Sequence, residues 1–129
     1  MKEVRAEAAP APVGPYSQAV AQDGWIFASG QIPIDPATGE LVDGGIEEQT
    51  VRVLTNLRAV LHAAGADFSD VVRTTIYLTD LSQFATVNSI YAEHFETRPA
   101  PARATVQVAA LPLGAQVEID CIARHPSPR

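Results

Sequence analysis

Two charged residues near the C-terminal end of the chain, Arg103 and Glu118, could together process a small acid. The guanidinium group of arginine is a planar fork that matches a carboxylate, so Arg103 could hold an anionic substrate in one orientation. A glutamate can accept a proton, return it, or orient a water molecule. The two residue types therefore point to a site where Arg103 binds an acid and Glu118 handles a proton or a water.

The pattern around these residues predicts that they share one face of a β-hairpin. Polar and apolar residues alternate on both sides of a Pro/Gly turn signal within residues 101–120. Because successive side chains of a strand point to opposite faces, Arg103 and Thr105 share one face, as do Glu118 and Asp120. Pairing the apolar faces then brings Arg103 and Glu118 within a pair or two of each other. The simpler alternative is a cross-strand ion pair, which contributes a few tenths to about 1 kcal/mol.

Other polar residues lie where loops could bring them near this pair. Tyr16 follows Gly14-Pro15, Ser29 precedes Gly30, Thr105 lies two residues after the arginine, and Asn88 lies inside a predicted helix. Taken singly, each of these side chains is more simply explained as a turn or capping group whose hydrogen bonds are satisfied locally.

The periodicities along the rest of the chain predict an α+β domain with the element order ββαβαββ. Helical spacing of apolar residues marks two helices, and runs rich in β-branched residues mark the strands. Two helices of this length are most simply packed on one face of a single sheet. The predicted elements are strands 16–21 and 25–29 around a turn at 22–24, a long loop 31–45, helix 46–64, strand 71–78, helix 82–95 and the terminal hairpin.

The predicted strand 71–78 has apolar residues on both of its faces. Val71 and Val72 are neighbours, and so are Ile76, Tyr77 and Leu78. Because two helices cover only one face of the sheet, the other face should be buried against another subunit. The sequence therefore predicts a homo-oligomer.

Length and composition indicate one ordinary globular domain, covering residues 1–129. Hydrophobic residues make up 47% of the chain and charged residues 19%. A formal net charge of −6 disfavours binding to a nucleic-acid backbone, since proteins that bind one carry a basic face. The Pro-rich ends, about residues 1–12 and 125–129, are expected to be flexible.

Few residues are suited to metal or thiol chemistry. The single cysteine, Cys121, excludes an intrachain disulfide, and its place on an apolar strand face predicts a buried structural thiol. The three histidines lie far apart without ligand spacing, so no metal site is expected. No apolar run could span a membrane, and acids occupy the N-terminal segment where a signal peptide needs an apolar core. We therefore expect a cytoplasmic protein.

Four separated motifs resemble the RidA (YjgF/YER057c/UK114) family. They are Gly14–Ala19, Ser29–Pro33, Glu48–Thr50, and the pair Pro101–Arg103 and Val117–Ile119, and the match extends from about Pro12 to Ala123. The resemblance implies a chorismate-mutase-like homotrimer with a mixed sheet and with active sites between subunits. It also implies metabolite damage control: hydrolytic deamination of reactive 2-enamine and 2-imino acids to 2-oxo acids and ammonia. Such a 2-iminobutanoate/2-iminopropanoate deaminase needs no cofactor and takes its substrates from pyridoxal-phosphate-dependent dehydratases.

The resemblance also implies roles for individual residues. Arg103 matches the arginine that binds the substrate carboxylate, and Glu118 matches the glutamate near the substrate nitrogen and water. Tyr16 joins these two in the predicted catalytic set. Substrate-binding positions are Arg103 itself with Ser29, Gly30, Thr105 and Asn88.

One position departs from the family pattern. Many members carry a cysteine two residues after the arginine, whereas this chain has Thr105. A thiol nucleophile therefore cannot be required here. Two alternative functions stay open: a non-catalytic trimer that binds small acids or a partner, and an RNA-directed member acting as a ribonuclease or translation inhibitor.

Overall fold

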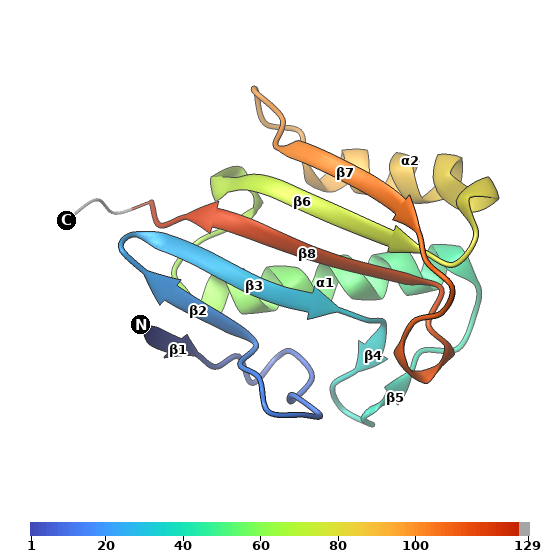
Figure 1. Cartoon of the computed structure of the whole chain (residues 1–129), viewed down its shortest axis with the longest axis horizontal. Coiled ribbons are helices and arrows are strands. Elements are labelled where there is room, and N and C mark those ends of the chain that lie inside the picture. Colours follow the sequence, from blue (N-terminus) through green and yellow to red (C-terminus); the bar gives the residue numbers. More distant parts are fainter. Residues whose placement is uncertain (127–129) are drawn as a thin grey trace.

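A mixed six-stranded sheet forms the centre of the molecule, and both α-helices pack on one face of it (Figure 1). The structure, a computed structural model, describes residues 1–126. The sheet order is β1-β2-β3-β8-β6-β7, with β6 and β7 parallel and the other neighbours antiparallel. The elements are β1 (Lys2–Val4), β2 (Ala19–Gln22), β3 (Trp25–Gln31), β4 (Ile34–Asp35), β5 (Glu40–Leu41), α1 (Ile46–Ala63), β6 (Val71–Leu78), α2 (Phe84–His94), β7 (Ala102–Gln107) and β8 (Val117–Arg124).

The predicted α+β class is confirmed, including both helices on one face. The order β2-β3-α1-β6-α2-β7-β8 is the predicted ββαβαββ. The opening hairpin forms as expected, because Asp23 and Gly24 adopt φ values of 56° and 83° in the two-residue turn between β2 and β3. Turns of this kind match the right-handed twist of the flanking strands.

Helix α1 supplies most of the apolar layer against the sheet. Glu48 Oε1 accepts a hydrogen bond of 2.9 Å from the Gly45 N–H at its start, and Gly65, with φ of 83°, follows its end. The first is a common N-terminal capping contact, and the second is a common residue just after a helix C-terminus. The sequence predicts one apolar stripe along this helix. Five of its six residues are fully buried and Ala64 at the end of the helix is half-buried; the five are Val53, Leu54, Leu57, Val60 and Leu61.

Helix α2 begins two residues later than predicted. A short 3₁₀ turn, Leu81–Gln83, precedes it, and the Asp80 carboxylate accepts a 2.9 Å hydrogen bond from the Ser82 N–H. Asp80 therefore caps the 3₁₀ turn, whereas α2 itself begins after Gln83 without a side-chain cap, so Ser82 does not act as the N-cap that the sequence suggested. Val87 and Tyr91 are buried as expected, and Phe95 is buried just after the helix.

The predicted terminal hairpin is wrong. Strand β6 lies between β7 and β8, pairing parallel with β7 and antiparallel with β8. The reason is that β6, α2 and β7 form a β-α-β unit, whose crossover helix returns the chain to the same edge in the same direction. Strand β8 consequently pairs with β6 and β3 in the interior of the sheet.

Three short strands were not predicted. Strand β1 pairs with β2 inside the N-terminal segment, and β4 pairs with β5 inside the predicted loop 31–45. Of the C-terminal end that was predicted to be flexible, residues 127–129 lie outside the described residues. Among residues 1–126, no helix is long and apolar enough to cross a membrane.

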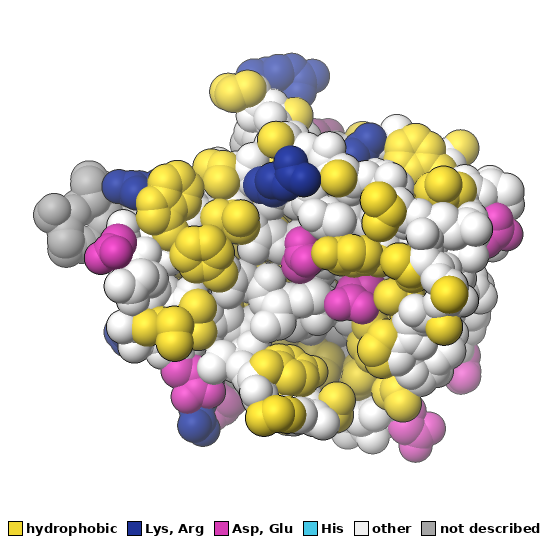
Figure 2. Space-filling view, in the orientation of Figure 1, with side chains coloured by type: hydrophobic (Ala, Val, Ile, Leu, Met, Phe, Trp, Pro, Cys, Tyr) yellow, Lys and Arg dark blue, Asp and Glu magenta, His cyan; other side chains and the backbone are white. Residues whose placement is uncertain are grey.

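The face of the sheet opposite the helices carries exposed hydrophobic side chains, and we call it the open face. Figure 2 shows it from the front, with hydrophobic side chains gathered over several strands. Phe27 and Val106 are 44% and 41% exposed, although both lie within strands. This is the uncovered apolar surface expected from the sequence.

Candidate active site

A cavity of about 380 Å³ gathers four of the predicted residues where β3 ends and β8 begins. Tyr16 comes from the loop before β2, Ser29 and Gly30 from β3, and Glu118 from β8. Gln18 and Gln31 also line the cavity, and the other wall residues are apolar: Pro10, Ala11, Pro12, Val13, Ile32, Ile34 and Pro112. We call this cavity the glutamate half-site.

Glu118 lies partly buried in this half-site, in surroundings that favour a proton on its carboxyl. Burial raises the pKa of Glu118, and the negative charge of Asp120 on the same face of β8 raises it further. A carboxyl group whose pKa is moved toward neutrality is better suited to accept and return a proton in catalysis.

The backbone of Gly30 lies directly against the Glu118 carboxyl group. A Cβ atom added to Gly30 would overlap a Glu118 carboxylate oxygen, so only glycine leaves room for the present rotamer. The close approach explains why a glycine occupies this position in the half-site.

Gly30→Ala is therefore expected to displace the Glu118 carboxyl and to lower activity by about 10²-fold, the scale of a displacement of about 1 Å in a reacting group. Thermal unfolding should change little, since the end of the Glu118 side chain can rotate away. Gly45→Ala is the matched control, because a Cβ there meets open space. Comparing kcat/KM of the two variants checks the prediction, and equal activities would contradict it.

The structure places Arg103 and Asn88 together in a second location, which we call the arginine half-site. Arg103 Nη1 donates a 2.7 Å hydrogen bond to Asn88 Oδ1 of α2. The guanidinium carbon also lies 4.9 Å from the ring centre of Tyr91 and 5.4 Å from that of Phe84. These contacts fix the position of the cation on the helix face of the sheet.

Arg103 has no carboxylate partner within the part of the chain that the structure describes. The ion pairs there involve Arg5, Arg58 and His62. The ordinary cross-strand pair of Arg103 with Glu118 is therefore wrong for this chain. An exposed guanidinium that is fixed by an amide and two rings retains donors for an external anion.

The two half-sites do not meet within one chain. Thr74 of β6 pairs with Arg103, whereas Tyr77 pairs with Glu118, and residues three apart on a strand point to opposite faces. The prediction that Arg103 and Glu118 share one face is consequently wrong. It failed because it rested on the hairpin, which strand β6 interrupts.

Thr105 and Ser29 belong to different half-sites. Thr105 pairs with Ile76 on the helix face, so it belongs with Arg103, and its Oγ1 is buried without a hydrogen-bond partner within residues 1–126. Ser29 Oγ donates a 2.7 Å hydrogen bond to the Ser17 carbonyl and so fixes the loop that carries Tyr16. Ser29 thus shapes the glutamate half-site as well as lining it.

Sequence reasoning missed the role of Gln18, although it lies inside one of the four motifs. Its buried side chain accepts a 2.7 Å hydrogen bond from the Ala6 N–H and donates bonds of 3.0 and 2.8 Å to the Ala6 and Pro10 carbonyls. These bonds hold residues 6–10 against the glutamate half-site. A glutamine among turn residues before an apolar strand was the available signal.

Cys121 is buried on the helix face, as predicted. Burial, with a smaller contribution from the charge of Asp120, raises the pKa of its thiol to about 12. Since the thiolate is the reactive form, the native protein at pH 7.5 should resist alkylation by iodoacetamide, whereas the denatured protein should be fully modified. Mass spectrometry of both samples checks this, and rapid labelling of the native protein would contradict it.

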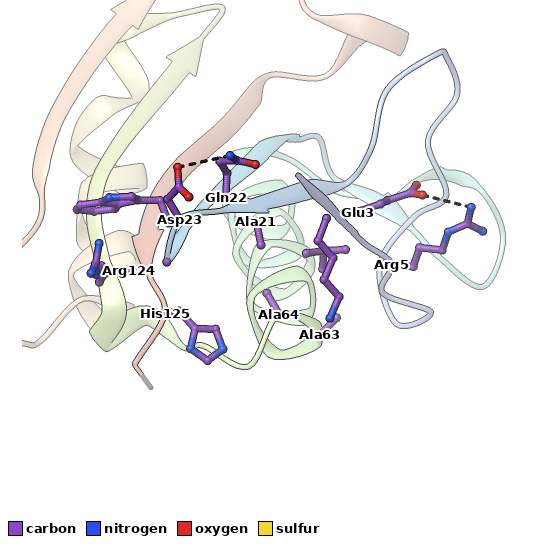
Figure 3. A pocket seen from close by; sticks show the side chains of 13 residues that line it. Glu3, Arg5, Ala21, Gln22, Asp23, Ala63, Ala64, Arg124 and His125 are labelled. Atoms are coloured by element: carbon purple, nitrogen blue, oxygen red, sulfur yellow. Dashed lines mark hydrogen bonds and ion pairs between the residues drawn. The ribbon is translucent and has the colours of Figure 1, made fainter. Parts of the chain in front are cut away.

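A larger cavity of about 610 Å³ lies away from the predicted residues, beside β1, the β2–β3 turn and the end of α1. Figure 3 shows Glu3 and Arg5 paired on one side of it and Arg124 on the other. None of the seven predicted site residues lines it. Size alone therefore does not identify the site.

Comparison with known proteins gives consistent matches over nearly the whole chain. Residues 6–125 match the family described as Endoribonuclease L-PSP. Protein DfrA of Myxococcus xanthus is 57% identical over 124 residues, which cover 95% of this chain and 94% of that protein. A Bos taurus protein named 2-iminobutanoate/2-iminopropanoate deaminase is 52% identical over 115 residues, covering 89% and 83% of the two chains.

A solved structure agrees with these sequence matches. The crystal structure of RidA from the Antarctic bacterium Psychrobacter sp. PAMC 21119 superimposes with a TM-score of 0.91 at 44% identity. The match covers 96% of this chain and 99% of that one. Sequence and fold therefore point to the same set of relatives.

Proposed function

Because the chain belongs to the Endoribonuclease L-PSP family, which includes RidA, we propose that it hydrolyses reactive 2-imino acids and their 2-enamine tautomers to 2-oxo acids and ammonia. The observation that carries the proposal is Arg103, a guanidinium fixed by Asn88 and two aromatic rings with no carboxylate partner in the described chain. Its fork fits the carboxylate that every 2-imino acid carries.

The substrate would lie between two subunits of a homotrimer. Arg103 and Glu118 lie on opposite faces of one chain, so one substrate can touch both only where half-sites of two subunits face each other. The exposed apolar side chains of the open face supply a surface for such contacts. Light scattering should give three times the mass of one chain, and a monomeric mass at micromolar concentration would exclude this arrangement.

Each half-site would act on one end of the substrate. Arg103 would bind the carboxylate, and Thr105, two residues away on the same face, offers a buried hydroxyl for a substrate oxygen or a bound water. Tyr16 and Ser29 line the glutamate half-site and would restrict how the substrate lies. Orienting the reactants in this way lowers the barrier because freedom is lost on binding rather than at the transition state.

Glu118 would then move the protons. The protonated Glu118 carboxyl first gives its proton to the imine nitrogen, and the resulting carboxylate accepts a proton from the water that adds to the iminium carbon, giving a carbinolamine. Glu118 returns this proton to the carbinolamine nitrogen. As the C–N bond breaks and ammonia leaves, the carboxylate accepts the hydroxyl proton, so the carbonyl of the 2-oxo acid forms and Glu118 is protonated again. Glu118 ends each cycle in its starting protonation state, and no further reactant is consumed.

The test is turnover of an imine generated in place. A serine or threonine dehydratase supplies the imino acid, and formation of pyruvate or 2-oxobutyrate is followed with and without this protein. Acceleration above the spontaneous rate supports the proposal. Saturable binding of 2-oxo acids without acceleration would instead indicate a non-catalytic binding protein.

The family description makes an RNA assay the natural second measurement. A net charge of −6 disfavours strong contacts with a phosphate backbone. RNA cleavage, or RNA binding that persists at about 0.2 M salt, would favour the RNA-directed alternative.

A further inference from the structure

Two residues beside Glu118, Tyr77 and Asp120, form a contact that the proposed mechanism does not use. Tyr77 of β6 is the direct cross-strand partner of Glu118. Its hydroxyl does not reach that partner but donates a 2.9 Å hydrogen bond to Asp120 Oδ2. Asp120 follows Glu118 by two residues, so both carboxyl groups project from the same face of β8.

The spacing puts two carboxyl groups close together on a partly buried surface. Residues two apart on a strand are separated by about 6.7 Å along the chain. Because both side chains project from the same face of a partly desolvated site, their negative charges repel each other. The hydrogen bond from the Tyr77 hydroxyl holds the Asp120 carboxyl in place beside Glu118, so the charge of Asp120 acts on the Glu118 carboxyl.

We propose that Asp120, held in place by the Tyr77 hydroxyl, is a positioning residue that keeps a proton available on Glu118 and thereby sets the pH range of the reaction. This inference rests on the proposed deaminase function for its consequence, but its physical basis is the contact itself. Neither residue needs to touch the substrate.

The other groups around Glu118 do not provide this effect. The titratable groups that face it are Asp120 from β8, Tyr77 from β6 and Tyr16 from the loop before β2. The adjoining part of β3, Gly30 and Gln31, carries no charge. In the assembled trimer Arg103 of a neighbouring subunit would act in the opposite direction, equally in the parent protein and in variants at Tyr77 or Asp120.

The pKa values of Tyr77 and Glu118 agree with this arrangement. Burial raises the pKa of Tyr77, and the hydrogen bond to Asp120 raises it further, as expected for a donor to a charged carboxylate. The pKa of Glu118 is raised by burial and by Asp120. Removing the charge of Asp120 should therefore make Glu118 a stronger acid.

The experiment is a direct titration of Glu118 by NMR in the full-length protein with ¹³C-labelled glutamate carboxyl groups. The Glu118 signal is assigned by its loss in Glu118→Gln. In Asp120→Asn we expect the Glu118 midpoint to move to lower pH by about half a unit or more. Asp23→Asn, which removes the same charge from the exposed β2–β3 turn, should leave the midpoint unchanged.

A double variant tests whether Tyr77 acts through Asp120. Tyr77→Phe alone should move the Glu118 midpoint in the same direction by a smaller amount. In the Asp120→Asn background it should add nothing, because the acceptor of its hydrogen bond has lost its charge. An unchanged midpoint in Asp120→Asn, or additive shifts in the double variant, would overturn the proposal.

The titration also separates this inference from the function on which it rests. If imine hydrolysis is observed, the pH profile of kcat/KM should shift with the Glu118 midpoint in Asp120→Asn. If the midpoint shifts but no imine hydrolysis is found, the proposed function fails and the control of Glu118 stands. If hydrolysis is found and the midpoint does not shift, only the role of Asp120 fails.

Discussion

Replacing Glu118 by glutamine is expected to lower kcat/KM for imine hydrolysis by about 10²–10⁴-fold, the usual contribution of a general acid–base group. Glutamine has nearly the same shape, but its amide neither accepts the water proton nor returns one to the leaving nitrogen. The side chain is only partly buried, and its carboxyl lies near the charge of Asp120. The substitution should therefore leave thermal stability unchanged or slightly higher.

The measurement is the dehydratase-coupled assay, corrected for spontaneous hydrolysis. Glu3→Gln on strand β1 is the matched control, since it removes a carboxylate far along the sheet from the glutamate half-site. Its activity should equal that of the parent protein. Parent-like kcat/KM in Glu118→Gln would show that proton transfer is carried by another group or by solvent.

Local signals were sufficient to predict most elements of this fold. The Asp23-Gly24 turn and the apolar stripe of α1 each depend on residues that are close in sequence, and both formed as predicted. The resemblance to RidA, based on four motifs, is confirmed by the family match. Turns and helices of this kind are determined mainly by residues that are close in sequence, so they can be predicted without knowing the rest of the fold.

Strand pairing could not be obtained in the same way. Alternation showed that residues around 103 and 118 form strands, but it does not say which strand lies beside which. A strand, a helix and another strand in succession favour a parallel pair, and the sequence placed α2 between β6 and β7. The Pro/Gly turn signal before β8 favours a hairpin of β7 and β8 instead, because a local signal does not show that β6 lies between them.

The site residues illustrate the same limit. Arg103 and Glu118 were selected by chemical type, while their separation onto opposite faces depends on the register of β6 with both neighbours. The contact of Tyr77 with Asp120 joins residues that are far apart in sequence, and no local pattern marks it. Where a side chain's face and neighbours depend on cross-strand register, only the structure shows them.

Arg103→Ala should lower kcat/KM by about 30- to 1000-fold, equivalent to about 2–4 kcal/mol of lost transition-state binding. The substrate carboxylate would then be desolvated in the cleft without a charged donor. Arg103→Lys should fall between the parent protein and Arg103→Ala, because lysine keeps the charge but loses the planar fork. Arg5→Ala, which changes an exposed arginine of the N-terminal segment, is the control and should keep full activity.

The arrangement of the two half-sites predicts a further result for the variants Arg103→Ala and Glu118→Gln. Arg103→Ala chains retain Glu118, and Glu118→Gln chains retain Arg103. If each active site takes Arg103 from one subunit and Glu118 from the next, trimers that contain both variants hold some intact sites. With random assembly from equal amounts, about a quarter of the sites receive both residues.

The two inactive variants are produced together, or unfolded and refolded together, and the assay is repeated on the mixture. We expect activity to rise from near zero to about a quarter of the parent value. Mixing preformed trimers of the two variants, without exchange of subunits, should restore no activity. Because Arg103 and Glu118 lie on opposite faces of each chain, a site completed within one subunit cannot form in this fold. No recovery after verified exchange would show that the two residues do not serve one substrate.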